Sequence, residues 1–389
     1  MKNDLTIASN RRELLASLLA FATISRAQDQ PPEVVMIPGK RGMILHNDRP
    51  EDLETPVRYF DQWLTPNDVF FVRQHLPRPT IKEVNFRLSI EGRVSRQIQL
   101  SVADLRKLPQ YTVPAVLECT GNGRGFFRPR VAGVQWGRGA IGNAEWSGPR
   151  LLDVLKLAGA DMQAAFITAN GADVGVAKTP DFIRSLPMRK AADPYTLLAL
   201  NMNGEPLSSL HGFPLRLVAP GWNGAGWVKW VTSLSVANEP DHGFYMNPAY
   251  RFPKRPVPPG TSANPADLEM IEAMPVKSYI TGHADGDRIP LSTTTLRGIA
   301  WAGEEQITKV EVSTDSGVSW SEAQLSAKAL PFTWRLWTLD WKPPALGYYT
   351  ILSRATDSAG RVQPIVPVWN PSGYLFNAVD RIGVIVEGG

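Results

Sequence analysis

From about residue 270 to its end, the chain carries the polar and apolar pattern of β-strands joined by short turns. Lys309–Ser313 alternates polar and apolar residues, which is typical of a half-buried strand, and Tyr348–Ala355 has a similar composition. Each is followed by a segment with turn composition, Asp315–Gly317 and Asp357–Gly360. We expect a further strand after the first turn, running to Trp320. This part is therefore predicted to be all β.

The first part of the chain mixes short apolar runs with helical spacing. Leu151, Leu155 and Ala158 share one face of a predicted helix that ends at Gly159. A second short helix begins after Ser101, which can cap its first turn, and ends before Pro109. The runs predicted to be strands are Val69–Val72, Tyr111–Leu117, Val134–Trp136 and Phe166–Thr168.

A proline-rich stretch, Lys254–Pro265, separates the two patterns and has the composition of a stiff linker. The length of 389 residues fits two domains. We therefore predict an α+β protein in which a mixed α/β domain (28–253) and a linker (254–269) precede an immunoglobulin-like sandwich (270–389).

The N-terminus has the pattern of an export signal. Arg11-Arg12 precedes the apolar run Leu14–Ile24, and small residues follow near Ala27. The run is too short to span a bilayer, which takes about 20 residues. The paired arginines favour the twin-arginine route, which exports folded proteins, over a plain secretory signal. We expect residues 1–27 to be removed and the mature protein to lie in the periplasm without a membrane span.

Charge and cysteine content exclude several classes of protein. The net charge is only +4, from 41 basic and 37 acidic residues, and no dense basic run suggests nucleic-acid binding. The single cysteine, Cys119, allows no internal disulfide. The sequence also lacks a Cys-x-x-Cys-His motif and cannot supply four cysteines to an iron–sulfur cluster, so we expect no haem or cluster in this chain.

Cys119 stands between a predicted buried strand and a glycine-rich loop, Gly121-Asn122-Gly123-Arg124-Gly125. A lone cysteine is often only a small buried hydrophobic residue. Here, however, glycine permits close approach of a ligand, and the Arg124 guanidinium favours a thiolate and could hold an oxyanion. A thiolate is a soft donor that suits transition metals.

The Cys-x-Gly-Asn-x-Arg loop resembles the molybdenum-ligand loop of the sulfite oxidase family. The resemblance implies that Cys119 binds molybdenum carried by a molybdopterin cofactor. It covers about residues 40 to 389 and implies the sulfite oxidase fold for the first domain. It also implies that the immunoglobulin-like domain mediates formation of a homodimer.

Three further pieces match the family in order and spacing: Met202-Asn203-Gly204, His211-Gly212-Phe213-Pro214-Leu215-Arg216 and Val228-Lys229-Trp230. Any one of these polar residues alone would have an ordinary structural explanation. Arginine can fork two phosphate oxygens and lysine supplies a point charge, so glycine-rich turns that carry both suit a phosphate. The resemblance implies cofactor contacts by His211, Arg216, Trp227, Val228 and Lys229.

The remaining predicted site residues come from separate stretches. Arg73 and His75 lie in Arg-Gln-His-Leu-Pro, which resembles a family stretch that contacts substrate and cofactor and has asparagine where Gln74 stands. Without the resemblance they could be a surface arginine and a loop histidine. Asp173 could be a turn aspartate, but its position resembles a family aspartate near the pterin. Tyr250 matches the active-site tyrosine of the family.

Two positions depart from the vertebrate members of the family. Ala249 stands where they have an aspartate before the tyrosine, and Ser372 stands where they have an arginine that reaches the active site. One cationic contact to the substrate is therefore missing at residue 372.

The resemblance implies a periplasmic sulfite dehydrogenase that passes electrons to an external cytochrome c. Sulfite would be held by Arg73 and Arg124 with Tyr250 nearby, and the metal would carry the redox chemistry. Within the family, the alternatives are a molybdenum subunit of a sulfane dehydrogenase and a sulfoxide reductase, although the short sulfoxide-reducing members lack the C-terminal sandwich. A non-catalytic exported binding protein is the alternative from another class.

Overall fold

The computed structural model describes residues 34–35 and 37–388. The predicted signal peptide, residues 1–27, lies outside these residues. Within the described ranges, no helix is long and apolar enough to cross a membrane.

A mixed five-stranded sheet forms one layer of the first part of the chain, in the order β5-β4-β14-β8-β9. Its central strand β14 runs parallel to β4 and antiparallel to β8, so segments far apart in sequence pair side by side. Leu234 of β14 lies opposite Ile90 of β4, and both are fully buried. The strands are β4 (Leu88–Gly92), β5 (Ile98–Leu100), β8 (Phe166–Gly171), β9 (Arg184–Pro187) and β14 (Val231–Ala237).

A second sheet, in the order β12-β11-β7-β6, leads to Cys119. Its longest pair, β6 and β7, runs antiparallel from Tyr111 opposite Gly148 to Glu118 opposite Ile141. β6 therefore ends directly before the cysteine. The strands are β6 (Tyr111–Glu118), β7 (Ile141–Gly148), β11 (Asn201–Met202) and β12 (Glu205–Pro206).

Two smaller pairs also carry residues of the site. β13 begins at Arg216 and pairs with β10, and β3 contains Asp52 and pairs with β2. The bounds are β1 (Val34–Val35), β2 (Met43–Asp48), β3 (Glu51–Glu54), β10 (Leu197–Ala199) and β13 (Arg216–Val218).

The α-helices described in this part are short: α2 (Val102–Lys107), α3 (Leu151–Leu157) and α4 (Met188–Ala191). α2 starts at the predicted cap, Ser101, and the structure adds a capping box, in which Ser101 and Asp104 bind each other's backbone N–H groups. α3 buries Leu151 and Leu155, together with Ala158 directly after it, and Gly159 follows with φ +62°. Its apolar face packs into a core shared with both sheets.

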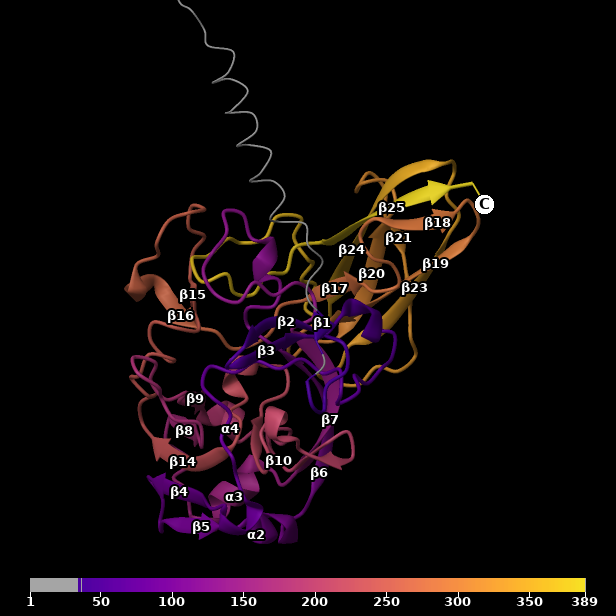
Figure 1. Ribbon diagram of the computed structural model, residues 1–389. Helices are drawn as coiled ribbons and strands as arrows, with labels where there is room; N and C mark the ends of the chain where they lie inside the picture. The colour runs from indigo at the N-terminus through magenta and orange to yellow at the C-terminus, as the bar shows by residue number, and fades with distance from the viewer. Residues whose placement is uncertain (1–33, 36, 389) are drawn as a thin grey trace, which may run out of the picture. The chain divides into compact units, whose positions relative to one another are not determined.

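The C-terminal part is a β-sandwich of two sheets, ordered β17-β19-β23-β22 and β18-β25-β24-β20-β21 (Figure 1). Leu296, Trp337, Ile351 and Ile382 are buried in its core. The all-β prediction for this part is confirmed. The strands are β17 (Lys277–Ile280), β18 (Asp287–Pro290), β19 (Thr294–Trp301), β20 (Ile307–Ser313), β21 (Ser321–Glu322), β22 (Gln324–Leu325), β23 (Arg335–Trp341), β24 (Gly347–Asp357) and β25 (Asp380–Glu387).

The proline-rich stretch between the two parts is a loop closed by paired strands. β15 (Arg251–Pro253) and β16 (Leu268–Met270) run antiparallel on either side of it, with Pro253 opposite Leu268. The end of the loop at β16 therefore lies beside its beginning at β15. The domain limits of 253 and 270 remain predictions.

Three predicted strands are wrong in detail. Val69–Val72 lies in a turn and forms only one bridge, between Val72 and Leu53. Its side chains are apolar because they fill the core from a loop, not because they alternate across a sheet. Val134–Trp136 also forms no strand, although Trp136 is fully buried. The strand expected to run to Trp320 is the two-residue β21, which begins one residue later.

Candidate active site

Cys119 lies in a tight turn at the end of β6. Its backbone N–H donates to the carbonyl of Ala140 at 2.9 Å, and its own carbonyl accepts from the N–H of Asn122 at 2.8 Å. Gly123 has φ +84°, a conformation that favours glycine, and lets the chain turn into a 3₁₀ helix at Arg124–Phe126. The turn leaves the half-buried Cys119 on the wall of a cavity.

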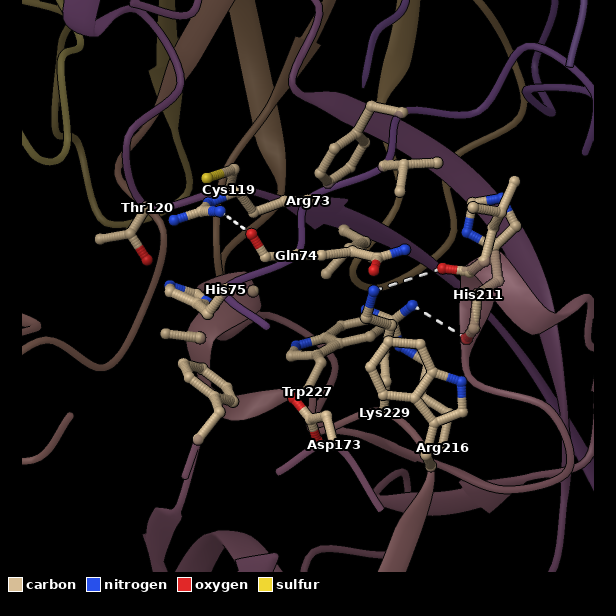
Figure 2. A pocket seen from close by; sticks show the side chains of 18 of the residues that line it. Arg73, Gln74, His75, Cys119, Thr120, Asp173, His211, Arg216, Trp227 and Lys229 are labelled. Atoms are coloured by element: carbon tan, nitrogen blue, oxygen red, sulfur yellow. Dashed lines mark hydrogen bonds between the residues drawn. The ribbon is translucent and has the colours of Figure 1, made fainter. Parts of the chain in front are cut away.

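This cavity holds about 670 Å³ of empty space, including the part that opens to solvent. Side chains reach it from loops and strands far apart in sequence (Figure 2). Nine predicted site residues line it: Arg73, His75, Cys119, Asp173, His211, Arg216, Trp227, Lys229 and Tyr250.

One end of the cavity is rich in buried cationic groups. Arg216 donates from Nη1 to the His211 carbonyl at 3.2 Å, and Lys229 donates from Nζ to the Leu210 carbonyl at 3.3 Å. Behind them, Lys40 Nζ lies 2.7 Å from His211 Nε2. We call these four residues the cation cluster. Among the described residues, none of the four forms an ion pair with a carboxylate.

Burial disfavours the charged forms of this cluster. It lowers the pKa of Arg216 to about 9 and that of Lys40 to about 7. It also lowers the pKa values of Lys229 and His211 well below their usual ranges, and neighbouring cations add to the effect. Arg216 Nε is buried without a hydrogen-bond partner. Unpaired buried donors are costly, so the cluster suits a bound anion such as the phosphate of a pterin cofactor.

The Cys119 end has a different charge arrangement. Arg73 donates from Nη1 to Asp52 Oδ1 at 3.1 Å and to the Gln74 carbonyl. Burial alone would lower the pKa of Arg73, but the Asp52 carboxylate holds it above its usual value. Burial raises the pKa of the Cys119 thiol, and Arg73 and Arg124 act against this rise. A metal ion would shift the same thiol to its thiolate form, so Cys119 suits a metal-ligand role.

Aromatic rings close this end of the cavity. The Tyr250 hydroxyl oxygen lies 2.6 Å from His75 Nε2, and Phe182 stacks on His75 with ring centroids 4.3 Å apart. Tyr374 stacks on Tyr250 at 5.3 Å. Tyr250 has φ +56°, an uncommon conformation for a bulky residue. Burial raises the pKa of Tyr250 and lowers that of His75, so both are neutral near pH 7.

Arg124 and Val228 are the two predicted site residues that do not line the cavity. Arg124 is buried and donates to the carbonyls of Ser372 at 3.1 Å and Val134 at 3.0 Å. Its guanidinium packs so closely on Gly121 that a Cβ there would lie 2.6 Å from Nη2. Arg124 thus packs against the backbone of the Cys119 turn and not on the cavity wall. Val228 is buried and accepts a backbone hydrogen bond from Leu217.

Asp173 and Trp227 complete the wall near Lys229. Burial raises the pKa of Asp173, and the charge of Lys229 opposes that rise. Trp227 donates from Nε1 to the Trp222 carbonyl at 3.1 Å, which fixes its ring in the wall.

Lys40, Asp52 and Arg184 were not predicted from the sequence. Each is a buried charged residue whose neighbours come from remote segments, and none lies in a recognisable motif. Arg184 stands 5.0 Å from the Tyr250 ring. For Arg184, the one local signal was its position directly after the apolar pair Phe182-Ile183.

The C-terminal sandwich contacts the Cys119 turn through Glu118. The Glu118 carboxylate accepts from Lys277 Nζ at 2.5 Å and from Trp301 Nε1 at 3.0 Å, both residues of the sandwich. It also accepts from Asn122 Nδ2 at 3.0 Å. This buried network connects the residue before Cys119 to the sandwich.

Among the described residues, no group of three or more His, Cys, Asp or Glu side chains could hold a metal ion by itself. Cys119 is therefore considered together with a cofactor that brings its own donors. The single sulfur, the cation cluster without a carboxylate partner and the unsatisfied Arg216 Nε fit a metal-bearing pterin with an anionic phosphate.

Comparison with known proteins assigns both parts of the chain. Residues 75–245 match the model of the oxidoreductase molybdopterin-binding domain, and residues 268–387 match that of the Mo-co oxidoreductase dimerisation domain.

Relatives of known identity match over most of the chain. Mitochondrial sulfite oxidase of Rattus norvegicus is 34% identical over 361 residues, which cover 88% of this chain and 65% of the relative. Sulfite oxidase of Arabidopsis thaliana is 32% identical over 349 residues, which cover 82% of this chain and 88% of the relative. The chain thus spans just under two thirds of the rat protein's length.

A solved structure has the same fold over nearly its full length. The sulfane dehydrogenase SoxCD from Paracoccus pantotrophus matches with a TM-score of 0.74 and 28% sequence identity, covering 94% of this chain and 95% of the matched chain. The predicted fold, a molybdopterin-binding domain followed by a β-sandwich, is confirmed.

Proposed function

The chain belongs to the sulfite oxidase family of molybdenum-dependent oxidoreductases, and from this premise we propose that it oxidises sulfite to sulfate. Its cofactor is molybdenum-bearing molybdopterin. When bound, this cofactor supplies the two-electron oxidation of the substrate sulfur. The observation that carries the proposal is one cavity with the Cys119 sulfur and Arg73 at one end and buried cations without a carboxylate partner at the other.

The residues divide into cofactor and substrate groups. Cys119 would supply a sulfur ligand to the metal, while His211, Arg216 and Lys229 would hold the phosphate. Figure 2 shows Arg73 beside Cys119, where its guanidinium would hold two sulfite oxygens. With neutral His75 protonated at Nε2, Tyr250 would accept a hydrogen bond from His75 and donate its own hydroxyl hydrogen to a substrate oxygen.

The placement of Arg124 changes its proposed role. Its hydrogen bonds to two backbone carbonyls leave it behind the cavity wall, so it would act on sulfite through its charge rather than by direct contact. The same charge favours the thiolate form of Cys119.

We propose an external cytochrome c as the electron acceptor and a homodimer as the assembly. The acceptor proposal rests on the sequence, which has one cysteine and no motif for covalent haem attachment. The dimer proposal rests on the match of residues 268–387 to a dimerisation domain. Both can be tested on purified protein, by reduction of horse-heart cytochrome c and by light scattering.

A sulfane dehydrogenase subunit is the second candidate. It is favoured by the full-length fold match to a sulfane dehydrogenase. The aromatic surroundings of Tyr250, formed by Phe182, Tyr245 and Tyr374, would also suit a substrate whose sulfur carries an organic group.

We propose a periplasmic location reached by the twin-arginine route, on the basis of Arg11-Arg12 and the apolar run after it. Changing both arginines to lysine should leave active protein in the cytoplasm. Normal periplasmic activity from that variant would instead favour the general secretory route.

Metal analysis and a substrate comparison test the proposed function together. The enzyme proposal requires about one molybdenum per chain, whereas a non-catalytic binding protein requires none. Sulfite and a persulfide should then be compared as substrates, with the same artificial electron acceptor in both assays. A kcat/KM at least tenfold higher for sulfite supports sulfite oxidation, and the reverse ratio supports the sulfane candidate.

A further inference from the structure

Arg184 is a buried cation without a carboxylate partner. It is the first residue of β9 and is only 2% exposed. Its Nη1 donates to the Tyr245 carbonyl, whereas its Nε has no hydrogen-bond partner. No ion pair among the described residues includes it. Such a charge is unfavourable in a protein interior unless an anion that binds nearby compensates it.

The position of Arg184 links it to the substrate end of the cavity. Its guanidinium carbon lies 5.0 Å from the centre of the Tyr250 ring, and Tyr250 lines the cavity. The Tyr250 hydroxyl is 2.6 Å from His75 Nε2, and both side chains line the cavity. The guanidinium itself does not line the cavity.

Arg184 differs from the two other arginines near the substrate end in the groups that surround its charge. The charge of Arg73 is offset by Asp52 at 3.1 Å, and Arg124 is bound to two neutral carbonyls. Burial lowers the pKa of Arg184 only to about 10, so it stays protonated at neutral pH. Burial lowers the pKa of His75, and the charges of Arg73, Lys229, Arg184 and Arg124 lower it further, so the field of Arg184 reaches the cavity.

We propose that Arg184 is a positioning residue that sets the affinity of the cavity for a small oxyanion, through its charge and its contact with Tyr250. This inference rests on the sulfite-oxidising function proposed above and names the residue that tunes it. Because the interior around Arg184 has a low dielectric constant, its charge acts on a dianion across one aromatic ring without touching it.

The test compares three variants of the holoenzyme. Arg184→Met keeps the length of the side chain but removes its charge, and Arg184→Lys keeps the charge but loses the planar fork. Arg189→Met is the matched control, because Arg189 lies five residues further along the chain with an exposed side chain that pairs with Glu272. We expect Arg184→Met to raise KM for sulfite about ten- to a hundredfold with kcat changed less than threefold. Arg184→Lys should reverse at least half of the rise in log KM. Arg189→Met should change neither KM nor kcat.

A purely structural role predicts a different result. If Arg184 only supports the fold, Arg184→Met lowers the melting temperature and leaves KM unchanged, and that outcome overturns the proposal. The charge role predicts a melting temperature at or above that of the wild type in anion-free buffer, because a buried unpaired charge has been removed.

Calorimetric titration with sulfate separates this proposal from the proposed function. If the wild type binds sulfate at least tenfold more tightly than Arg184→Met, the role of Arg184 stands even if sulfite is not oxidised. If sulfite is oxidised but both proteins have equal sulfate affinity and equal KM, the function stands and the role of Arg184 is wrong.

Discussion

The cationic side chains that line the two ends of the cavity have different partners. At the end near β13, Arg216 and Lys229 are buried against backbone carbonyls and form no ion pair with a described residue. At the end near Cys119, Arg73 is held at 3.1 Å by Asp52 and aromatic rings surround the remaining space. The first arrangement leaves charge to be neutralised by a ligand, whereas in the second the arginine that lines the cavity, Arg73, already has a counter-charge within the protein.

This difference matches how long each anion should stay. An unpaired buried cation makes the empty protein less stable and so favours an anion that remains bound, as a cofactor phosphate does. A cation already paired with a carboxylate binds a second anion less tightly, which suits a substrate that must leave as product. The chain thereby separates cofactor retention from turnover within one cavity.

The largest effect should come from the sulfur itself. We expect Cys119→Ser to reduce sulfite oxidation at least a thousandfold, because a hard hydroxyl replaces a soft thiolate. The cation cluster is untouched, so bound pterin should stay within twofold of the wild type. Steady-state assay and pterin fluorescence after denaturation measure the two quantities. A variant with wild-type activity would remove Cys119 from the metal site.

Arg73→Gln should be next in size. It removes a charge-assisted contact to the substrate, which costs about 2–5 kcal/mol, so kcat/KM should fall by roughly two to four powers of ten. Arg73→Lys should recover only part of the lost kcat/KM, because a point charge cannot fork two oxygens. Molybdenum content should stay full in both. Near-native kcat/KM in fully loaded variants would place substrate binding elsewhere.

The same change leaves Asp52 as an uncompensated buried carboxylate, which calls for a separate control. The double variant Arg73→Gln with Asp52→Asn removes both charges and should restore stability without restoring kcat/KM. If activity returns with stability, the role of Arg73 is structural.

At the end of the cavity near β13, Arg216→Met should affect retention of the cofactor rather than turnover of the substrate. We expect at least tenfold less bound pterin, while the cofactor-free variant should be more stable than cofactor-free wild type by about 1–3 kcal/mol, because an unsatisfied buried group is removed. Denaturant unfolding and pterin quantification measure this pair of effects. Arg288→Met, a change at an exposed side chain of the sandwich, is the control and should alter neither. A destabilised apo variant would contradict the comparison.

The local patterns in the sequence located most of this site. Cys119 and the segment from His211 to Lys229 lie in short contiguous motifs, so their resemblance to the family's motifs was enough to locate them. The helix after Arg150 and the strand before Cys119 were also predictable, because their periodicity matches the face that they bury.

Residues whose role depends on distant neighbours were not predictable. Lys40 matters because folding brings it within 2.7 Å of His211, 171 residues away in sequence. Val69–Val72 was assigned to a strand because a loop that fills the core has the same composition as a buried strand. Arg124 lies in the predicted loop, yet the direction of its side chain depends on contacts with Val134 and Ser372.

A graded effect is expected in the pH dependence of cofactor retention. Burial lowers the pKa of Lys40 to about 7 in the cofactor-free protein, and a phosphate near His211 would raise it. Cofactor binding therefore takes up a proton above pH 7, and affinity should fall as pH rises, by up to about tenfold per unit. Pterin released by dialysis should be greater at pH 9 than at pH 7. Lys40→Met should flatten this dependence, and an unchanged profile would exclude Lys40 as its source.

The claim that Cys119 links the protein to the metal is tested most directly by X-ray absorption at the molybdenum edge, on wild type and Cys119→Ser loaded with equal metal. We predict that the variant shows one sulfur neighbour fewer than the wild type. Identical sulfur coordination in the two proteins would contradict the account.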